Sequence, residues 1–121
     1  MTQPTETWPT ELKLVDEKRA LHISWDDNRR DTLEAEYLRV ESPSAEVQGH
    51  TPAEKQIVPG KKNVTIRDVV PVGTYAVRLV FSDGHSTGIF TWRYLRNLAD
   101  ERSKIWGTYL EALAARGLSR S

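Results

Sequence analysis

The sequence predicts an α+β fold: a small, mainly antiparallel β-sheet with hairpins, a long central loop, and C-terminal helices packed on one face. Two periodicities indicate this class. Apolar and polar side chains alternate over 21–25 and recur at every second position over 75–81, which is the repeat of a β-strand. From 92 to 113 apolar side chains recur at spacings of three and four, which makes an amphipathic helical stripe. We expect one domain over 10–118, preceded by a flexible tail over 1–9.

The first half of the chain is predicted to contain three strands and a short helical turn. The strands are expected over 12–15, 21–25 and 30–33. A polar turn over 16–19 separates the first two strands. Asp26-Asp27-Asn28 supplies the next turn, because Asn and Asp tolerate left-handed backbone. The segment 34–39 then favours a helical turn.

The middle of the chain, 42–63, is expected to be a long loop, because it contains three prolines and two glycines and has little periodicity. Ser42 and Pro43 are suited to open one helical turn there, with Ser as the cap and Pro at the first helical position. Loops of this length tend to be either functional or disordered. The sequence leaves both interpretations open.

The second half returns to strands and ends in helices. Its strands are expected over 64–66, 75–81 and 88–90. The segment 69–73 is expected to be a connector. The strand over 75–81 has apolar residues on both faces, Tyr75 among them, so it should be central in the sheet. Thr91 is suited to cap the helical region, Asp100-Glu101 to divide it into two helices, and Gly117 to end it.

Two segments of the chain resemble each other at a nearly constant offset, which grows by one position after Ile89. The matching pieces are 23–28 with 79–84, Leu33 with Ile89, and 37–39 with 94–96. Each reads as a strand, an Asp turn, a strand and a helical Tyr-Leu-Arg. The similarity is either a coincidence between two common units or a true repeat. A true repeat predicts two similar ββα units packed on one sheet, too few for a solenoid.

The charge balance argues against nucleic-acid and membrane binding. The 121 residues include 17 basic and 17 acidic side chains, so the formal net charge is zero. Non-specific binding to nucleic acid or to a membrane needs a surplus of basic side chains on the protein. Residues 1–60 carry 7 basic and 12 acidic side chains, and residues 61–121 carry 10 and 5. Either the two halves neutralise each other when they pack, or a basic helix is offered to an acidic partner.

The sequence lacks cysteine and long apolar runs. Without cysteine the chain has no disulfide, thiol nucleophile or Cys-ligated cluster. No apolar run approaches the roughly 18–20 residues of a membrane span, and residues 1–9 hold no apolar core of a signal peptide. We therefore expect a cytoplasmic protein.

No motif for catalysis or for a bound cofactor emerges. The chain has neither the Gly-x-Ser-x-Gly elbow of hydrolases nor a glycine-rich phosphate loop. Ser82, Asp83 and His85 are too close in sequence to form a nucleophile–base relay with ease. We therefore expect no enzymatic activity and no cofactor.

Two binding hypotheses follow from the remaining residues. The first is a protein-interaction or accessory domain, because aromatic and arginine side chains dominate protein interfaces. Its candidate contact residues are Tyr37, Arg39, His85, Trp92 and Arg96. The partner is unidentified, and a homo-oligomer stays open. The alternative is a small-ligand or metal-binding module in which His50 and His85 converge, although a metal site needs two to four close ligands.

Several motifs together carry a family resemblance. They are Leu21-x-Ile23-x-Trp25-x-Asp27, Tyr37-Leu38-Arg39, the stretch 42–47, Gly73-x-Tyr75-Ala76, Asp83-Gly84-His85-x-Thr87-Gly88-Ile89 and Trp92-x-x-Leu95-Arg96. Over roughly 12–98 the chain resembles the small N-terminal domain of gamma-butyrobetaine hydroxylase, which also occurs alone in bacteria. The resemblance implies the fold and no activity, since the iron and 2-oxoglutarate chemistry belongs to a separate catalytic domain. Similar domains are also joined to P-loop ATPases of iron–sulfur cluster delivery. That association between domains, and no residue of this chain, implies an accessory role in cluster assembly.

The resemblance also implies a metal position that is altered in this chain. In the hydroxylases three cysteines and the histidine of the Asp-Gly-His turn bind zinc. Their positions here are Ser42, Ser44, Val47 and His85, so only the histidine is kept. Neutral hydroxyls and an aliphatic side chain do not replace thiolates on zinc. We therefore expect no metal at this position and a loop that is held by other means.

Overall fold

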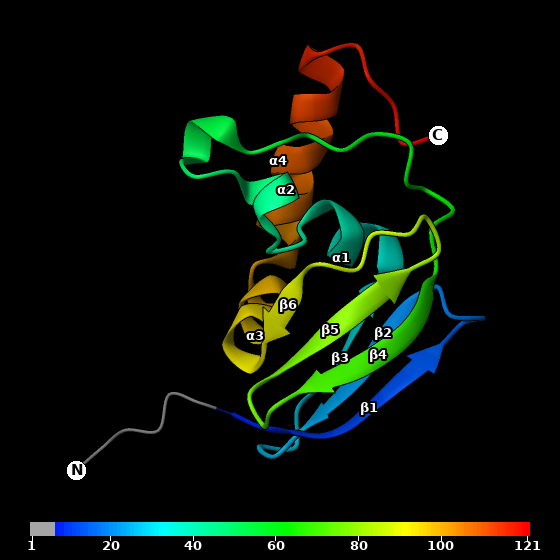
Figure 1. Ribbon diagram of the computed structural model, residues 1–121, viewed down its shortest axis with the longest axis vertical. Coiled ribbons are helices and arrows are strands. Elements are labelled where there is room, and N and C mark those ends of the chain that lie inside the picture. Colours follow the sequence, from blue (N-terminus) through cyan, green and yellow to red (C-terminus); the bar gives the residue numbers. More distant parts are fainter. Residues whose placement is uncertain (1–6) are drawn as a thin grey trace.

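The computed structural model describes residues 7–121 and confirms the α+β class, with two small sheets in place of the single expected one (Figure 1). The first sheet is antiparallel, with the strand order β1-β2-β3. Its strands are β1 (Pro9–Val15), β2 (Ala20–Trp25) and β3 (Arg30–Glu34). The central strand β2 buries Leu21, Ile23 and Trp25, which the period of two places on one face.

The expected tail over 1–9 overlaps the first sheet. Residues 1–6 lie outside the described part of the chain. The Trp8 N–H donates to the Asp26 carboxylate at 3.2 Å, and the Trp8 carbonyl accepts from the Asp26 N–H at 2.8 Å. Pro9 then opens β1. Trp8 and Pro9 therefore belong to the fold, because backbone pairing holds them at the sheet.

The second sheet is also antiparallel, with the order β4-β5-β6. Its strands are β4 (Ile66–Val72), β5 (Ala76–Phe81) and β6 (Ile89–Thr91). β5 is central, as its two apolar faces predict. The expected connector over 69–73 is wrong, because residues 69–72 continue β4. Pro71 made this segment look like a connector, because proline is rare inside strands. β4 lies at a sheet edge, where proline is tolerated because its missing N–H can face away from the partner strand.

Four α-helices and one 3-10 turn complete the described chain. They are α1 (Ala35–Val40), α2 (Ala45–Gln48), the 3-10 turn η1 (Pro52–Glu54), α3 (Trp92–Asp100) and α4 (Arg102–Ala115). Thr91 caps α3 by accepting the Tyr94 N–H, and Glu101 separates α3 from α4, both as predicted. The helical turn α2 follows Ser44, two residues later than the Ser42–Pro43 start that we expected. None of the helices within 7–121 is long and apolar enough to cross a membrane.

One apolar core joins both sheets to the helices. Buried side chains of β2 and β5 share this cluster with Leu95 and Leu98 of α3. In Figure 1 the sheets lie towards the lower right of the view and the helices towards the upper left. The C-terminal helices thus lie to one side of the sheets, as expected, and α1 joins them there.

The two halves of the chain repeat each other in space. β2 and β5 begin at equivalent positions, Ala20 and Ala76, and have the same alternation of buried and half-buried side chains. α1 and α2 of the first half correspond in the same way to α3 and α4 of the second, with the offset one position larger. Each half is therefore three strands followed by two helices, and not the ββα unit on a shared sheet that we predicted for a true repeat. The predicted match of Leu33 with Ile89 is also off by one, because Leu33 and Phe90 are the buried pair.

Equivalent hydrogen bonds are exchanged between the halves. The Tyr37 hydroxyl donates to the Leu98 carbonyl at 2.7 Å, and the Tyr94 hydroxyl donates to the Glu41 carbonyl at 2.5 Å. Positions 37 and 94 are equivalent in the repeat, and so are 41 and 98. Because each half gives the other the same bond, an approximate two-fold axis relates the two units.

Candidate functional site

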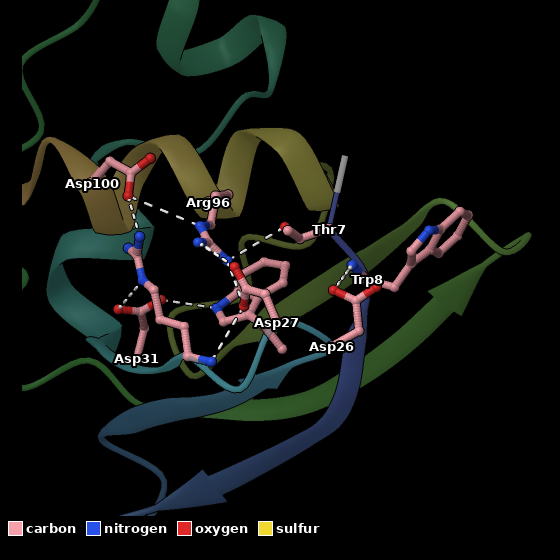
Figure 2. A network of polar contacts seen from close by, with 9 residues as sticks. Thr7, Trp8, Asp26, Asp27, Asp31, Arg96 and Asp100 are labelled. Carbon is pink, nitrogen blue, oxygen red and sulfur yellow. Dashed lines mark hydrogen bonds and ion pairs between the residues drawn. The ribbon is translucent and has the colours of Figure 1, made fainter. Parts of the chain in front are cut away.

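Two of the predicted interaction residues, Arg39 and Arg96, occupy equivalent places and bond the turn of the opposite half. Arg96 Nη2 lies 2.8 Å from Asp27 Oδ2 (Figure 2), and Arg39 Nε lies 2.8 Å from Asp83 Oδ2. Asp27 and Asp83 are themselves equivalent, each in the turn after the central strand of its sheet. The Arg39 and Arg96 side chains are only 12% and 20% exposed. Both arginines therefore tie the two halves together.

We call the first of these contacts the Arg96 seam; it consists of Asp27, Arg29, Arg96 and Asp100. Arg29 Nη1 lies 2.6 Å from Asp100 Oδ1, which joins the turn after β2 to the end of α3. The Arg96 guanidinium also lies 5.2 Å from the ring centroid of Trp25, within cation–π range. The hydrogen bond from Arg96 lowers the pKa of the Asp27 carboxyl. Figure 2 shows the carboxylates of Asp27 and Asp100 directed towards Arg96.

We call the second contact the His85 seam; it consists of Arg39, Ser42, Ser44, Asp83 and His85. Ser42 Oγ lies 2.9 Å from His85 Nε2, and Ser44 Oγ lies 3.4 Å from the same nitrogen. Burial raises the pKa of Asp83, but hydrogen bonds from Lys61, the His85 N–H and Arg39 outweigh it and bring this pKa to about 2. Burial, followed by the nearby Arg39 charge, lowers the pKa of His85.

Three of the four positions that correspond to the family's zinc ligands therefore meet in the His85 seam, while Val47 is buried at 2% exposure. The donors present do not suit zinc. Two are neutral hydroxyls that share one imidazole nitrogen, and the third position is aliphatic. Within 7–121 there is also no group of three or more His, Cys, Asp or Glu side chains placed to hold a metal ion.

His50, the other half of the metal-binding alternative, has different partners. It is exposed in the loop after α2, and its N–H donates to the Glu54 carboxylate at 2.7 Å. His85 Nε2 lies against Ser42 and Ser44, and His85 Nδ1 lies 3.5 Å from Glu46 Oε1. The contacts of the two histidines thus give the metal-binding alternative no support.

The order Ser42, His85, Glu46 is that of a catalytic relay, but its surroundings do not suit that role. The Ser42 side chain is completely buried. A Cβ on Gly88 would lie 2.2 Å from Ser42 Oγ, so the hydroxyl is enclosed on that side as well. A nucleophile must reach a substrate carbonyl, and this one cannot. The hydrogen bonds of the relay serve to join α1 and the loop to the turn after β5.

Tyr37 was expected near the contact surface, and this expectation is wrong. Its side chain is 0% exposed, and its hydroxyl bonds to α3. The burial follows from the two-fold arrangement, since Tyr37 and its equivalent Tyr94 reach across the axis between the halves. Sequence spacing alone could not reveal this, because the two tyrosines lie in different halves of the chain.

An open groove of about 730 Å³ lies beside α3 and brings together two of the predicted contact residues, Trp92 and Arg96, the latter shared with the Arg96 seam. Its lining consists of Thr7, Trp8, Tyr75, Thr91, Trp92, Arg93, Arg96, Asn97 and Asp100. Trp8 is 48% exposed and Tyr75 is 55% exposed. The half-buried Trp92 is fixed by its Nε1–H, which donates to the Thr74 carbonyl at 2.8 Å. We call this the aromatic groove.

Sequence reasoning missed Trp8 and Tyr75 as groove residues. Trp8 was placed in the tail, and Tyr75 was placed on the buried face of the central strand. Tyr75 instead precedes β5, which begins at Ala76, and follows the tight turn at Gly73. The Gly-Thr pair before Tyr75 was the available signal, since glycine there has φ of +54° and marks a turn rather than a strand.

Comparison with known proteins places the chain in a family. The family model described as gamma-butyrobetaine hydroxylase-like, N-terminal, matches residues 12–96. A crystal structure of a protein of unknown function from Acidithiobacillus ferrooxidans, in the DUF971 family, is 47% identical with a TM-score of 0.63, and the match covers 75% of this chain and 91% of that one.

Two further solved structures, both determined by NMR in solution, are similar over nearly the whole chain. One is 46% identical with a TM-score of 0.83 and covers 99% of this chain and 89% of the other. The second is 42% identical with a TM-score of 0.80 and covers 95% and 90%. None of the curated proteins matches the chain. The resemblance read from the motifs is confirmed, and the chain belongs to the family of gamma-butyrobetaine hydroxylase-like N-terminal domains, whose relatives in the DUF971 family are of unknown function.

Proposed function

We propose that this domain is a non-catalytic module that binds a partner protein through the aromatic groove. The observation that carries the proposal is the clustering of Trp8, Tyr75 and Trp92 along one groove with two of these rings about half exposed. Large aromatic side chains left in contact with water lose favourable burial, and they are the residues that contribute most to protein interfaces. Arg93 and Arg96 at the same groove add to that composition.

The resemblance names two classes of candidate partner. Related domains are joined to an oxygenase catalytic domain or to P-loop ATPases of iron–sulfur cluster delivery. Both classes are proposed because related domains are fused to proteins of these kinds. Apart from Arg96 and Asp100, the groove is lined by side chains that take no part in the two seams.

The proposed function is tested by capture followed by a measured affinity. The native chain, the double variant Trp8→Ala/Tyr75→Ala and the control Leu110→Ala would be immobilised in parallel. Leu110 is 39% exposed on α4 and lies outside the groove, so it matches the loss of an exposed apolar side chain. A partner retained by the native chain and the control should be lost from the double variant.

The same partner, purified, should then bind the native chain in calorimetry at least about tenfold more tightly than the double variant, since hot-spot aromatics each contribute more than about 1 kcal/mol. Equal affinity of all three proteins for that partner would show that the groove is not the binding surface. Circular dichroism of each variant establishes that the fold is retained.

We further propose that the His85 seam has lost the family's zinc and is held by hydrogen bonds. The support is its donor set, in which Ser42 and Ser44 share His85 Nε2. The triple variant Ser42→Cys/Ser44→Cys/Val47→Cys should therefore acquire about one zinc per chain, because three thiolates and an imidazole form a closed tetrahedral site. Adding His85→Ala to it should weaken that binding. Stoichiometric zinc in the purified native protein would contradict the proposal.

A further inference from the structure

A smaller cavity, of about 270 Å³, lies between the end of α1, the loop after η1 and α4. The loop crosses α4 (Figure 1), and the Tyr109 hydroxyl of α4 donates to the Val58 carbonyl of the loop at 2.6 Å. The apolar walls of the cavity are Val40, Ile57, Ile105, Ala112 and the ring of Tyr109. No lining residue belongs to the aromatic groove or to either seam. We call this the Glu41 cavity, after the carboxylate that also lines it.

Glu41 is a buried carboxylate at a position where the fold also accepts an apolar residue. Its side chain is only 6% exposed. Burial raises the pKa of its carboxyl, and the hydrogen bond from Lys55 opposes that rise. The equivalent residue in the repeat is Leu98, which is buried in the apolar core. A buried ion pair is weak evidence for stability, whereas a buried ionisable group in a cavity is a feature of functional sites.

Two lysines give the Glu41 cavity a surplus of positive charge. Lys55 Nζ lies 2.6 Å from Glu41 Oε1. This contact uses one of the three N–H donors of the ammonium group and fixes the group beside the cavity. Lys104 lines the cavity from α4 and forms no ion pair with any of residues 7–121. One carboxylate and two ammonium groups therefore leave the lining with a net charge of +1 beside its apolar walls.

We infer that the Glu41 cavity binds a small ligand that has an apolar body and a carboxylate, with the carboxylate paired to Lys55 and Lys104. Apolar walls with a few fixed charged groups are the usual composition of ligand sites. The volume of about 270 Å³ lies just below the roughly 300–1,000 Å³ of such sites, so the ligand is smaller than a drug-sized molecule. The carboxylate belongs either to a free acid or to the C-terminus of a peptide that ends in apolar residues.

Three six-carbon probes that differ in charge test this inference: hexanoate, hexanamide and hexylammonium. Amide chemical shifts of the isotope-labelled native chain would measure both the affinity and the place of binding. We expect hexanoate to bind about fivefold more tightly than hexanamide, as partly exposed ion pairs allow, and hexylammonium to bind weakest. The largest shifts should fall within 55–57 and 104–112.

A tripeptide distinguishes the two sources of the carboxylate. Acetyl-Val-Ile-Leu would be titrated as the free acid and as the C-terminal amide. Tighter binding of the acid peptide than of hexanoate would assign the cavity to a peptide C-terminus, and the reverse order would assign it to a free acid. Equal binding of acid and amide, in the peptide pair and in the six-carbon pair alike, would overturn the inference.

Variants of α4 show whether the probes bind in the cavity itself. Ala112→Leu fills the cavity and should abolish hexanoate binding, whereas the control Ala114→Leu, at an exposed position of the same helix, should leave it unchanged. Lys104→Gln should bring the affinities for hexanoate and hexanamide closer together, and the control Lys62→Gln, at another exposed lysine, should not. Because Lys104 is exposed, that comparison holds even if Ala112→Leu fails to fold. Hexanoate shifts that persist in folded Ala112→Leu, or an acid preference that survives Lys104→Gln undiminished, would overturn the inference and leave the proposed function of the aromatic groove untouched.

Discussion

The packing around Ser42 makes a strong prediction about Gly88. A Cβ on Gly88 would lie 2.2 Å from Ser42 Oγ and 3.3 Å from both Phe90 Cε1 and Pro43 Cδ. The first distance is far inside ordinary van der Waals contact, and the Ser42 hydroxyl can turn away only by giving up its hydrogen bond to His85. Gly88→Ala should therefore lower the free energy of unfolding by about 1–3 kcal/mol, the usual cost of overpacking a core.

The double variant Ser42→Ala/Gly88→Ala separates this clash from other effects. Ser42→Ala alone should cost about 1–2 kcal/mol, because it removes a buried hydrogen bond to His85. In the double variant the methyl group introduced at position 88 occupies the space that the hydroxyl leaves. The cost of the two changes together should therefore be smaller than their sum by at least about 1 kcal/mol, as for other residues in direct contact.

Urea unfolding, followed by tryptophan fluorescence and circular dichroism at pH 7, measures each free energy, and equal slopes across the variants show that the comparison is valid. Gly107→Ala is the matched control, since a Cβ there would meet nothing within 4 Å beyond its chain neighbours and the backbone of its own helix. Strictly additive costs in the double variant, or a neutral Gly88→Ala, would refute the close packing of the His85 seam.

Three further predictions follow. Gly107→Ala should raise stability by about 0.5–1 kcal/mol in the same urea assay, because alanine is the better residue inside α4; a loss would show that α4 is not helical there. Tyr37→Phe and Tyr94→Phe should each cost about 1–2 kcal/mol, since each leaves a carbonyl of the other half without its donor, and very unequal losses would argue against the two-fold relation. Asp83 has a folded pKa of about 2, below the ordinary unfolded value, so it stabilises the fold above about pH 4 and this contribution, up to about 2 kcal/mol after solvent screening, is lost as the pH falls towards 2. Asp83→Asn should flatten that part of the pH profile, and an unchanged profile would contradict the ion pairs assigned to it.

Local patterns were sufficient to predict most elements of the fold. The alternation in 21–25 and the stripe in 92–113 each indicate which face of the strand or helix is buried. Such hydrophobic periodicity is the strongest structural signal in a single sequence. The exceptions have local causes. The second half of β4 was missed because a proline such as Pro71 is also typical of a connector. α2 was placed too early because serine and proline also suit the irregular link over 41–44 between α1 and α2.

The candidate site was less predictable, because its residues meet through the two-fold relation rather than through local spacing. Arg39 and Arg96 were identified as matching positions, yet their partners Asp83 and Asp27 lie far away in the sequence, in the opposite half. Tyr37 appeared to be a surface aromatic for the same reason. The repeat itself was visible in the sequence, but only the exchanged bonds show that its units face each other.

The two-fold relation also bears on the proposed loss of the family's zinc. His85, two positions after Asp83, corresponds in the repeat to Arg29, two positions after Asp27. In the Arg96 seam Arg29 bonds Asp100 at the end of α3, with an arginine–carboxylate pair at 2.6 Å. In the His85 seam His85 bonds Ser42 just after α1, at 2.9 Å. Both seams join a β-turn of one half to the helix end of the other. The Arg96 seam does this through an ion pair between side chains, so polar side-chain contacts can join the two halves at that place in the fold. A serine pair on His85 can therefore take the place at which the resemblance implies zinc in the hydroxylases.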